Sequence, residues 1–380
     1  MDYNLSEDQV MLKTSAREFL TKECPKKIVR EILASDTGYS PELWNKMAEL
    51  GWLGLAFPEE YGGTGYSFLD LIVLLEEMGY NTLPSPFFST IVLGGMAVLE
   101  FGTEDQKKEI LGKISNGKLI MSLAFTEKDG KFDPASIATK AVLKNDQYEI
   151  NGIKLFVTDA EISNCLLVAA RTHEMGSPSS SLSLFLVDTK TPGIEIKALK
   201  TMIDQKLYEV HFKGVKCPAT NILGKAGQGW PIIEKLLKKA SIAKCAEMVG
   251  GTQAVLDMSV QYAKERIQFG KPIGSYQAIQ HHCANMVIDL DGSRFITYKA
   301  AWTLNQGLDS DLVVSMAKAW TSDAFKHAAS LGHQIFGAIS FTLDHDLHFY
   351  LRDAKYGGIA YGNADYHRSV IAHCMGIAKK

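Results

Sequence analysis

The stretch Tyr262–Gln277, YAKERIQFGKPIGSYQ, separates two long helical patterns and decides how the chain is interpreted. Apolar residues recur at helical spacing before it, over residues 232–264, and after it, over residues 277–305. The stretch itself contains Pro272 and two glycines, which favour a short turn. A further helical run covers residues 312–335. Long helices joined by short glycine-containing turns indicate an antiparallel bundle.

Two blocks precede this bundle. Residues 1–117 show helical periodicity, and Ser6 is placed to cap the first helix. In residues 118–227 the pattern changes to short strands separated by polar turns, which suggests a small β-barrel or sandwich. Within this block, residues 148–158 are expected to form strand, turn and strand, and residues 173–180 a mobile loop.

Composition excludes several classes of function. The net charge of −3 gives no signal of polyanion binding, so neither nucleic acid nor an anionic membrane is expected as the main partner. The six cysteines are widely spaced without a CxxC pair, which is typical of reduced thiols in a cytoplasmic protein. We expect no signal peptide and no membrane span. His345 and His348 lack a suitably spaced carboxylate, so no metal site is expected either.

The Tyr262–Gln277 stretch resembles the YxxxRxQFGxPIxxxQ signature of the acyl-CoA dehydrogenase family. Further matching motifs follow the family's order along the whole chain: Phe57–Gly63, Thr126–Glu127, Asn151–Lys154, Gln334–Gly337 and Arg352–Lys355. The resemblance implies an α+β multidomain protein with an N-terminal helical domain (1–117), a central β-barrel domain (118–227) and a C-terminal four-helix bundle (228–380). This fold also carries flavin oxidases and monooxygenases, so the resemblance alone leaves the exact chemistry open.

In this family, a base removes the proton α to a thioester carbonyl, and the β hydride passes to N5 of FAD. The resemblance therefore implies FAD-dependent α,β-dehydrogenation of an acyl-CoA. It also implies transfer of the electrons to an electron-transfer flavoprotein, and a homotetramer or an α2β2 heterotetramer.

The resemblance implies three groups of FAD-binding residues. Those along the flavin ring and ribityl chain are Phe125, Thr126, Phe156 and Thr158, with the Thr158 hydroxyl near N5. Those reaching a neighbouring subunit's cofactor are Arg266, at the pyrophosphate, and Gln268, Phe269 and Gln277 beside it. Those receiving the adenosine end, also across a subunit boundary, are Gln334 and Gly337.

Ordinary structural roles are the alternatives for these residues. Thr158 and Phe156 would be plain strand residues. Arg266 would belong to a solvated charge cluster with Glu265, Phe269 would be core packing, and Gln334 would cap a helix.

Three departures from the family pattern bear on function. Tyr361 stands where many members have the catalytic glutamate, and a phenol with a pKa of about 10 is a poor proton acceptor at neutral pH. Phe132 replaces a small hydroxyl residue that contacts FAD phosphate and substrate in relatives. Ala338 replaces the second glycine of a Gly-Gly pair. The last two changes are expected to weaken FAD binding.

Glu247 is the candidate for the missing base. Some relatives carry the base at the position of Ala240, and Glu247 lies about two turns further along the same helix face. Small apolar neighbours are expected to desolvate its carboxylate and raise its pKa. The alternatives are an ion pair with Lys244 or a buried hydrogen bond to the backbone. Asp365 and Asp204 are weaker candidates.

The segment Phe341–Leu351, with Tyr366–Arg368 beyond it, resembles one branch of the family. Members of that branch act on bulky, ring-bearing or pimeloyl-type acyl-CoAs, and several combine two different subunits, one of which lacks the base. The alternative function is therefore a non-catalytic subunit that completes its partner's FAD site with Arg266 and Gln334. The acyl group and the direction of the reaction are not readable from the sequence.

Overall fold

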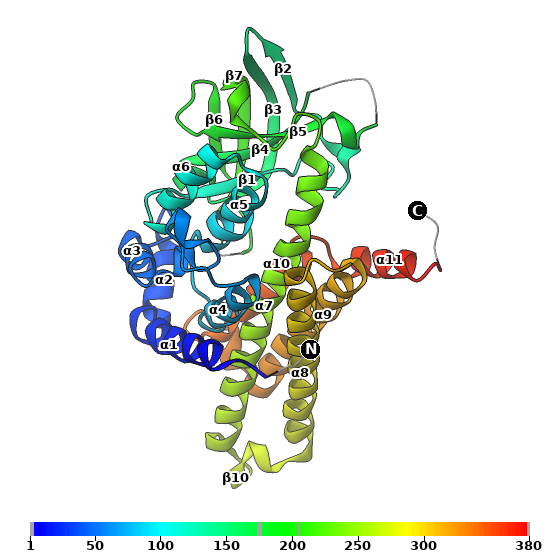
Figure 1. Cartoon of the computed structure of the whole chain (residues 1–380). Coiled ribbons are helices and arrows are strands. Elements are labelled where there is room, and N and C mark those ends of the chain that lie inside the picture. Colours follow the sequence, from blue (N-terminus) through cyan, green and yellow to red (C-terminus); the bar gives the residue numbers. More distant parts are fainter. Residues whose placement is uncertain (1–3, 173–176, 204, 378–380) are drawn as a thin grey trace. The chain divides into compact units, whose positions relative to one another are not determined.

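The computed structural model describes residues 4–172, 177–203 and 205–377. The chain forms two compact units (Figure 1). The helical unit comprises Met1–Glu31, Ser67–Leu83 and Lys238–Lys380, and the sheet unit comprises Ile32–Tyr66 and Pro84–Leu237. Part of the expected loop, residues 173–176, and the candidate base Asp204 lie outside the described residues.

The sheet unit is built on one eight-stranded sheet within the described residues. Its strands are β1 (Met121–Ala124), β2 (Lys140–Lys144), β3 (Gln147–Thr158), β4 (Cys165–Arg171), β5 (Leu182–Asp188), β6 (Ile194–Ala198), β7 (Leu207–Pro218) and β8 (Ile222–Leu223). The order is β6-β7-β3-β2-β4-β5-β8, and β1 pairs in parallel with β4. Most neighbours are antiparallel, and β4 and β5 are almost entirely buried, as the continuous apolar runs predict.

Strand β3 departs from regular pairing close to its end. Its register with β7 shifts between Lys154 and Val157. Phe156 lies in this bulge with φ +56°, a left-handed conformation that is uncommon for an aromatic residue. The bulge therefore redirects one side chain at the point where β3 approaches the end of β1.

Helices complete the sheet unit. They are α3 (Pro41–Glu49), α5 (Met96–Phe101) and α6 (Glu104–Ser115), together with a π-helix at Phe88–Gly95. Helix α2 (Lys26–Ala34) contributes residues to both units. Ser40 and Thr103 cap α3 and α6 through their hydroxyl groups, which explains where these helices begin.

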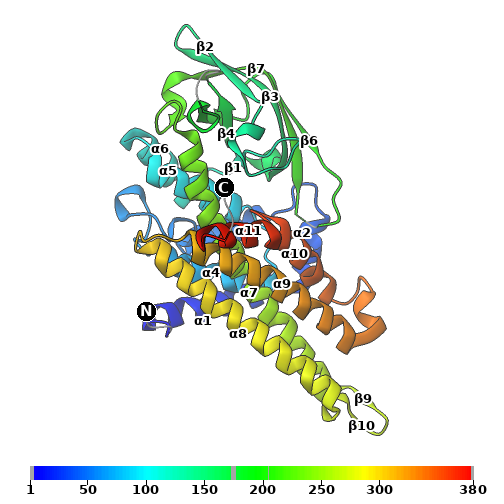
Figure 2. The same cartoon turned by 90° about the vertical axis from the view of Figure 1, so that its right-hand side faces the viewer.

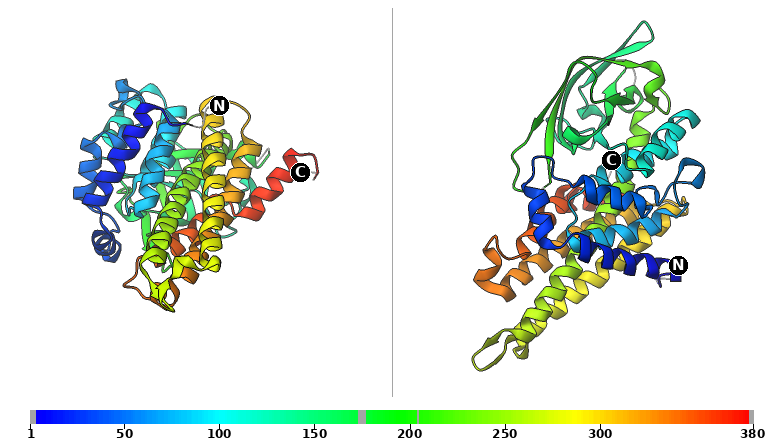
Figure 3. Two further views of the ribbon diagram at one scale, coloured as in Figure 1. Left: turned by 90° about the horizontal axis from the view of Figure 1, so that it is seen from below. Right: turned by 90° about the vertical axis from the view of Figure 1, so that its left-hand side faces the viewer.

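The helical unit contains long helices whose positions agree with the sequence pattern. They are α1 (Glu7–Glu23), α4 (Phe68–Asn81), α7 (Gly229–Glu265, from Lys238 onward in this unit), α8 (Gln277–Asn305), α9 (Asp311–Phe336), α10 (Leu347–Ile359) and α11 (Ala364–Cys374). Ser6 caps α1 in a capping box, as expected. Helix α1 packs along α4, as Figure 3 shows.

Helix α4 is more buried than the amphipathic pattern suggested. Its acidic residues Glu76 and Glu77 are also buried, with 1% and 0% of their surface exposed. Glycines allow a close crossing with α7, because a Cβ on Gly250 would lie 1.8 Å from the Glu76 carbonyl oxygen. A Cβ on Gly79 would lie 2.1 Å from the Glu247 carbonyl oxygen. None of the helices in the described part of the chain combines the length and apolar character that a bilayer crossing requires.

Candidate functional site

In the sheet unit, the segment after β1 is fastened to β3 by a buried ion pair. The Lys154 ammonium donates to the Glu127 carboxylate at 2.7 Å and to the Phe125 carbonyl at 3.3 Å. The Leu155 amide donates to the Thr126 carbonyl at 2.9 Å. Burial lowers the pKa of Lys154 to about 8, although Glu127 opposes this shift. Phe125 and Thr126 are therefore held beside the end of β3.

Phe156 and Thr158 lie at this same place. Phe156, with its left-handed backbone, is 54% exposed, whereas Thr158 is buried and its carbonyl accepts a hydrogen bond from Ser122. A non-glycine residue in this conformation costs about 1–3 kcal/mol and is typical of functional sites. The structure thus brings together all four sheet-unit residues that the resemblance assigns to the flavin.

An aromatic cluster continues this surface. The Phe132 ring packs against Phe125 with centroids 6.2 Å apart, and Trp230 packs on Phe125 at 6.1 Å. Trp230 was not anticipated as part of the site, although the glycine-rich turn before it marks an element boundary next to an aromatic residue. Phe132, the expected departure from the family, therefore contacts a residue assigned to the flavin.

In the helical unit, Arg266, Gln268 and Phe269 lie on a small hairpin, β9 (Ile267–Gln268) and β10 (Lys271–Pro272), at the ends of α7 and α8 (Figure 2). Phe269 and Gly270 form its tip, both with positive φ. Phe269 is 92% exposed, so the core-packing alternative is wrong.

The polar residues of this region also face solvent. Arg266, Gln268 and Gln277 are exposed. Among the described residues, no carboxylate forms an ion pair with Arg266, so a solvated cluster with Glu265 at this helix end would contain no salt bridge. The side chains thus extend beyond the contacts of their own unit, as residues that reach a neighbouring molecule would.

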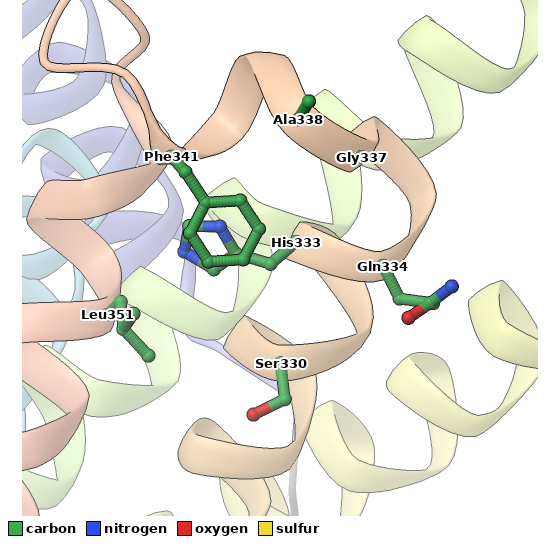
Figure 4. A pocket seen from close by; sticks show the side chains of 7 residues that line it. All are labelled: Ser330, His333, Gln334, Gly337, Ala338, Phe341 and Leu351. Carbon is green, nitrogen blue, oxygen red and sulfur yellow. The ribbon is translucent and has the colours of Figure 1, made fainter.

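Gln334 and Gly337 line a pocket of about 350 Å³ at the end of α9. Its other lining residues are Ser330, His333, Ala338, Phe341 and Leu351 (Figure 4). Gly337 has φ +66°, and a Cβ there would meet no atom within 4 Å, so the backbone borders open space. Within the described chain the Gln334 side chain caps no helix, and Figure 4 shows it at the pocket.

The pocket and the hairpin belong to one end of the helical unit. The ring of Tyr262, near the end of α7, stacks on Phe336 with centroids 4.3 Å apart. Phe336 directly precedes Gly337, and Tyr262 lies four residues before Arg266. The structure therefore gathers the helical-unit residues that the resemblance assigns to a neighbour's FAD.

The two positions where relatives carry the base also meet. The Tyr361 carbonyl accepts hydrogen bonds from Ser241, the residue after Ala240, at 3.3 Å and from the His367 ring at 3.1 Å. Tyr361 itself has φ +57°, which marks a strained turn. This turn therefore lies against α7 within the helical unit.

A buried lysine that the sequence reasoning missed fixes the same turn. The Lys318 ammonium donates to the Gly357 and Gly362 carbonyls, both at 2.9 Å, and burial lowers its pKa to about 8. Lys318 is a cation within the apolar run of α9, and this position was the sequence signal for a buried lysine. The pKa of His367 is lowered to about 4 by burial and by Lys318.

Glu247 does not lie in the purely apolar setting that was expected. Its carboxylate forms an ion pair with Lys244, and its side chain is 24% exposed. Burial alone would lower the pKa of Lys244, but Glu247 and Tyr356 raise it above its usual value. The ion-pair alternative is therefore observed. Asp365 is 86% exposed and pairs with Arg368.

Comparison with known proteins identifies the family. Models of the acyl-CoA dehydrogenase N-terminal, middle and C-terminal domains match residues 6–118, 122–215 and 227–376. The chain therefore belongs to the acyl-CoA dehydrogenase family and is an FAD-dependent oxidoreductase.

Individual relatives match over the full length. A probable acyl-CoA dehydrogenase, YngJ of Bacillus subtilis, is 32% identical, with 98% of this chain and 99% of the relative covered. The butyryl-CoA dehydrogenase structure from Megasphaera elsdenii is similar with a TM-score of 0.92 at 28% identity, over 99% of this chain and 100% of the other. A chain in a structure titled for the electron transferring flavoprotein of Acidaminococcus fermentans has a TM-score of 0.93 at 31% identity, over 99% of both chains.

The residues present in each unit fit FAD. The sheet unit presents an exposed aromatic ring on a strained bulge, which suits a planar ring system. The helical unit holds an open pocket with a buried ring nitrogen, His333 Nε2, that has no hydrogen-bond partner among the described residues. No group of three or more histidine, cysteine or acidic residues in the described chain is arranged to hold a metal.

Proposed function

We propose that the chain catalyses α,β-dehydrogenation of an acyl-CoA thioester and passes the electrons to an electron-transfer flavoprotein. The observation that carries this proposal is the joint placement of Phe125, Thr126, Phe156 and Thr158 around the strained β3 bulge. Relatives named as acyl-CoA dehydrogenases support the reaction, and the related chain in the electron transferring flavoprotein structure supports the electron acceptor.

The chain's own residues have distinct tasks in this proposal. FAD, when bound, supplies the hydride acceptor. Phe156 and Phe125 provide aromatic surface for a planar ring, and Thr158 provides a hydroxyl to hydrogen-bond it. Arg266 offers a guanidinium that suits a pyrophosphate, since paired charge-assisted hydrogen bonds favour that geometry.

Glu247 is proposed as the proton acceptor. Tyr361 and Ala240, which occupy the two positions used by relatives, lack a carboxylate. Glu247 lies on the same helix as Ala240, and its carboxylate forms an ion pair with Lys244. Proton transfer would be accompanied by release of this salt bridge, because a carboxylate that accepts a proton no longer attracts the ammonium.

The proposed assembly is a homotetramer or an α2β2 heterotetramer built through the helical unit. Exposed apolar side chains on α8 and α9 support it, including Ile288 (63% exposed), Phe295 (52%) and Trp320 (49%). The exposed hairpin tip agrees with a site completed between subunits. The proposed substrates are bulky or ring-bearing acyl-CoAs, on the resemblance of Phe341–Leu351 to that branch.

The decisive experiment measures flavin in the purified chain and its anaerobic bleaching by acyl-CoAs of increasing bulk. We expect about one FAD per chain and loss of flavin absorbance with at least one bulky acyl-CoA. Bleaching that requires a second polypeptide would instead support the non-catalytic subunit of a heteromeric enzyme. Rapid oxygen consumption by the reduced protein would support a monooxygenase on the same fold.

A further inference from the structure

The pocket at the end of α9 contains a histidine that neither the family signature nor the mechanism uses. His333 is 6% exposed and lines the pocket with Gln334 and Phe341. Its Nε2 atom is fully buried and has no hydrogen-bond partner among the described residues. A buried polar atom is normally satisfied by protein, water or a ligand, and beside a pocket this nitrogen is open to either a water molecule or a ligand.

Hydrogen bonds around Ser340 favour one tautomer of this ring. The Ser340 hydroxyl lies 2.7 Å from the Gly337 carbonyl, and only the hydroxyl can donate in that contact. Its oxygen also lies 2.9 Å from His333 Nδ1. The same hydroxyl lies 3.4 Å from the His333 carbonyl, the other acceptor within reach. With the hydroxyl proton assigned to a carbonyl, Nδ1 is assigned as the donor to Ser340. Nε2 is then a bare acceptor, and its ligand must supply an N–H or O–H group.

The charge state of the ring agrees with this assignment. Burial lowers the pKa of His333 below its usual value, and the neighbouring His345 and His348 lower it further. The imidazole is therefore neutral at neutral pH and keeps one acceptor nitrogen.

The remaining lining suits a flat, heteroaromatic group. The Phe341 ring lies across His333 in Figure 4, with ring centroids 4.9 Å apart and planes tilted by 34°. Phe341 is 73% exposed, so its ring can turn aside, or offer a face for stacking, without unpacking a core. Gln334 provides an amide that can donate and accept at the pocket's edge.

We propose that His333 Nε2 accepts a hydrogen bond from the exocyclic amine of adenine and so makes this pocket selective for adenine over hypoxanthine. The adenine is that of FAD bound to a neighbouring copy, so the inference rests on the proposed function. Adenine carries an N–H donor at its 6-position, whereas hypoxanthine carries a carbonyl that would face the bare nitrogen of His333. Ser340 acts as a positioning residue that holds the imidazole in the required tautomer.

Two dinucleotides test the proposal without altering the protein. The full-length chain is freed of flavin and titrated with FAD and with its hypoxanthine analogue, and binding is followed by quenching of flavin fluorescence. We expect the analogue to bind roughly ten- to a hundredfold more weakly, since the acceptor nitrogen stays unpaired. Equal affinities would overturn the inference while leaving the proposed function intact, whereas binding of neither dinucleotide would count against both.

Single substitutions test which residue causes the preference for adenine over hypoxanthine. His333→Leu should bind FAD about as weakly as the parent binds the analogue and should no longer distinguish the two. Ser340→Ala should lose part of the preference, because the imidazole is then free to place its proton on Nε2. The control is His327→Leu, on the same helix but 51% exposed, which should keep the parent's preference. If His333→Leu retains full discrimination, another residue reads the base and the assignment is wrong.

Discussion

Tyr361 occupies the position of the family's usual base, yet its turn is firmly held by hydrogen bonds from Ser241 and His367. These contacts are to the backbone, so they fix the turn whatever side chain it carries. A tyrosine there can shape the site without taking part in proton transfer, since a phenol is a poor proton acceptor at neutral pH. The residue that accepts the proton must then be sought elsewhere, and Glu247 is the proposed one.

Replacing Glu247 by glutamine tests this assignment. Glu247→Gln keeps the size of the side chain but cannot accept the proton, so flavin reduction by acyl-CoA should slow at least about a hundredfold. FAD content should not change. Tyr361→Phe serves as the comparison and should cost far less. Rapid mixing measures the rate of flavin reduction in each variant. An unchanged rate in Glu247→Gln would show that Glu247 is not the proton acceptor.

Individual residues differ in how far the sequence could define them. The motif around Phe269 predicts a cofactor contact, and its 92% exposure shows that it is not packed in the core of its own chain. The Lys244 ion pair was recognised only as an alternative, because helical spacing places two residues near each other but does not show how their side chains turn. The position of Lys318 within an apolar run indicated burial, but neither Lys318 nor His333 has a partner at a defined spacing that would show its role.

At the scale of elements, we propose that the exposed β9–β10 hairpin contacts the cofactor of a neighbouring molecule. Arg266 is exposed and has no ion-pair partner in the described chain, so Arg266→Ala should leave the melting temperature unchanged. It should nevertheless lower FAD occupancy after dialysis, because a charge-assisted contact contributes roughly 1.5–3 kcal/mol. Lys264→Ala, an exposed neighbour at the end of α7, is the control. Full flavin retention in Arg266→Ala would contradict a cofactor contact.

The crossing of α4 and α7 gives a prediction about stability. Gly250→Ala would place a Cβ 1.8 Å from the Glu76 carbonyl oxygen, so the helices must separate and we expect a loss of about 3 kcal/mol or more. Gly358 on α10 is the matched control, because its Cβ would meet no atom within 4 Å. Gly358→Ala should be neutral or stabilising by about 0.5–1 kcal/mol. Thermal melting compares the two, and equal effects would show that the crossing tolerates a side chain.

The sequence predicted the elements well where periodicity was long. Residues 277–305 form α8 as expected, and α7 and α9 differ from expectation by a few residues at their ends. The sequence pattern could not predict the bulge at Phe156 or the burial of Glu76 and Glu77 on α4, because both depend on what the chain packs against. The three-domain division at 117/118 and 227/228 stays a prediction.

At the scale of the helical unit, Glu76 links stability to pH. Its carboxylate accepts hydrogen bonds from Lys13 at 2.7 Å and Tyr298 at 2.9 Å, and Arg294 lies 3.2 Å away. Burial alone would raise the pKa of Glu76, but Arg294 and Lys13 outweigh it and hold the pKa below 4.5. The unfolded chain therefore takes up the proton first as the pH falls, and the stabilisation is lost below about pH 4.5.

Glu76→Gln should accordingly be less stable than the parent at pH 7 by about 3 kcal/mol, the low end for a broken buried pair, because Lys13 and Arg294 remain partly hydrated. The difference should shrink as the pH falls from 4.5 towards 3. Urea unfolding of both proteins at several pH values measures it. A difference that is constant from pH 7 to pH 3 would show that Glu76 is not ionised in the folded protein.

For the whole molecule, the central claim is that this chain binds FAD and uses it to oxidise an acyl-CoA thioester. The most direct measurement is anaerobic titration of the purified, flavin-loaded protein with saturated acyl-CoAs, with absorbance followed at the flavin band. We predict bleaching by a bulky acyl-CoA, together with formation of the α,β-unsaturated thioester and reoxidation by an electron-transfer flavoprotein. A protein that holds no FAD, or whose flavin stays oxidised with every acyl-CoA tested, alone or with a second dehydrogenase subunit, would contradict the claim.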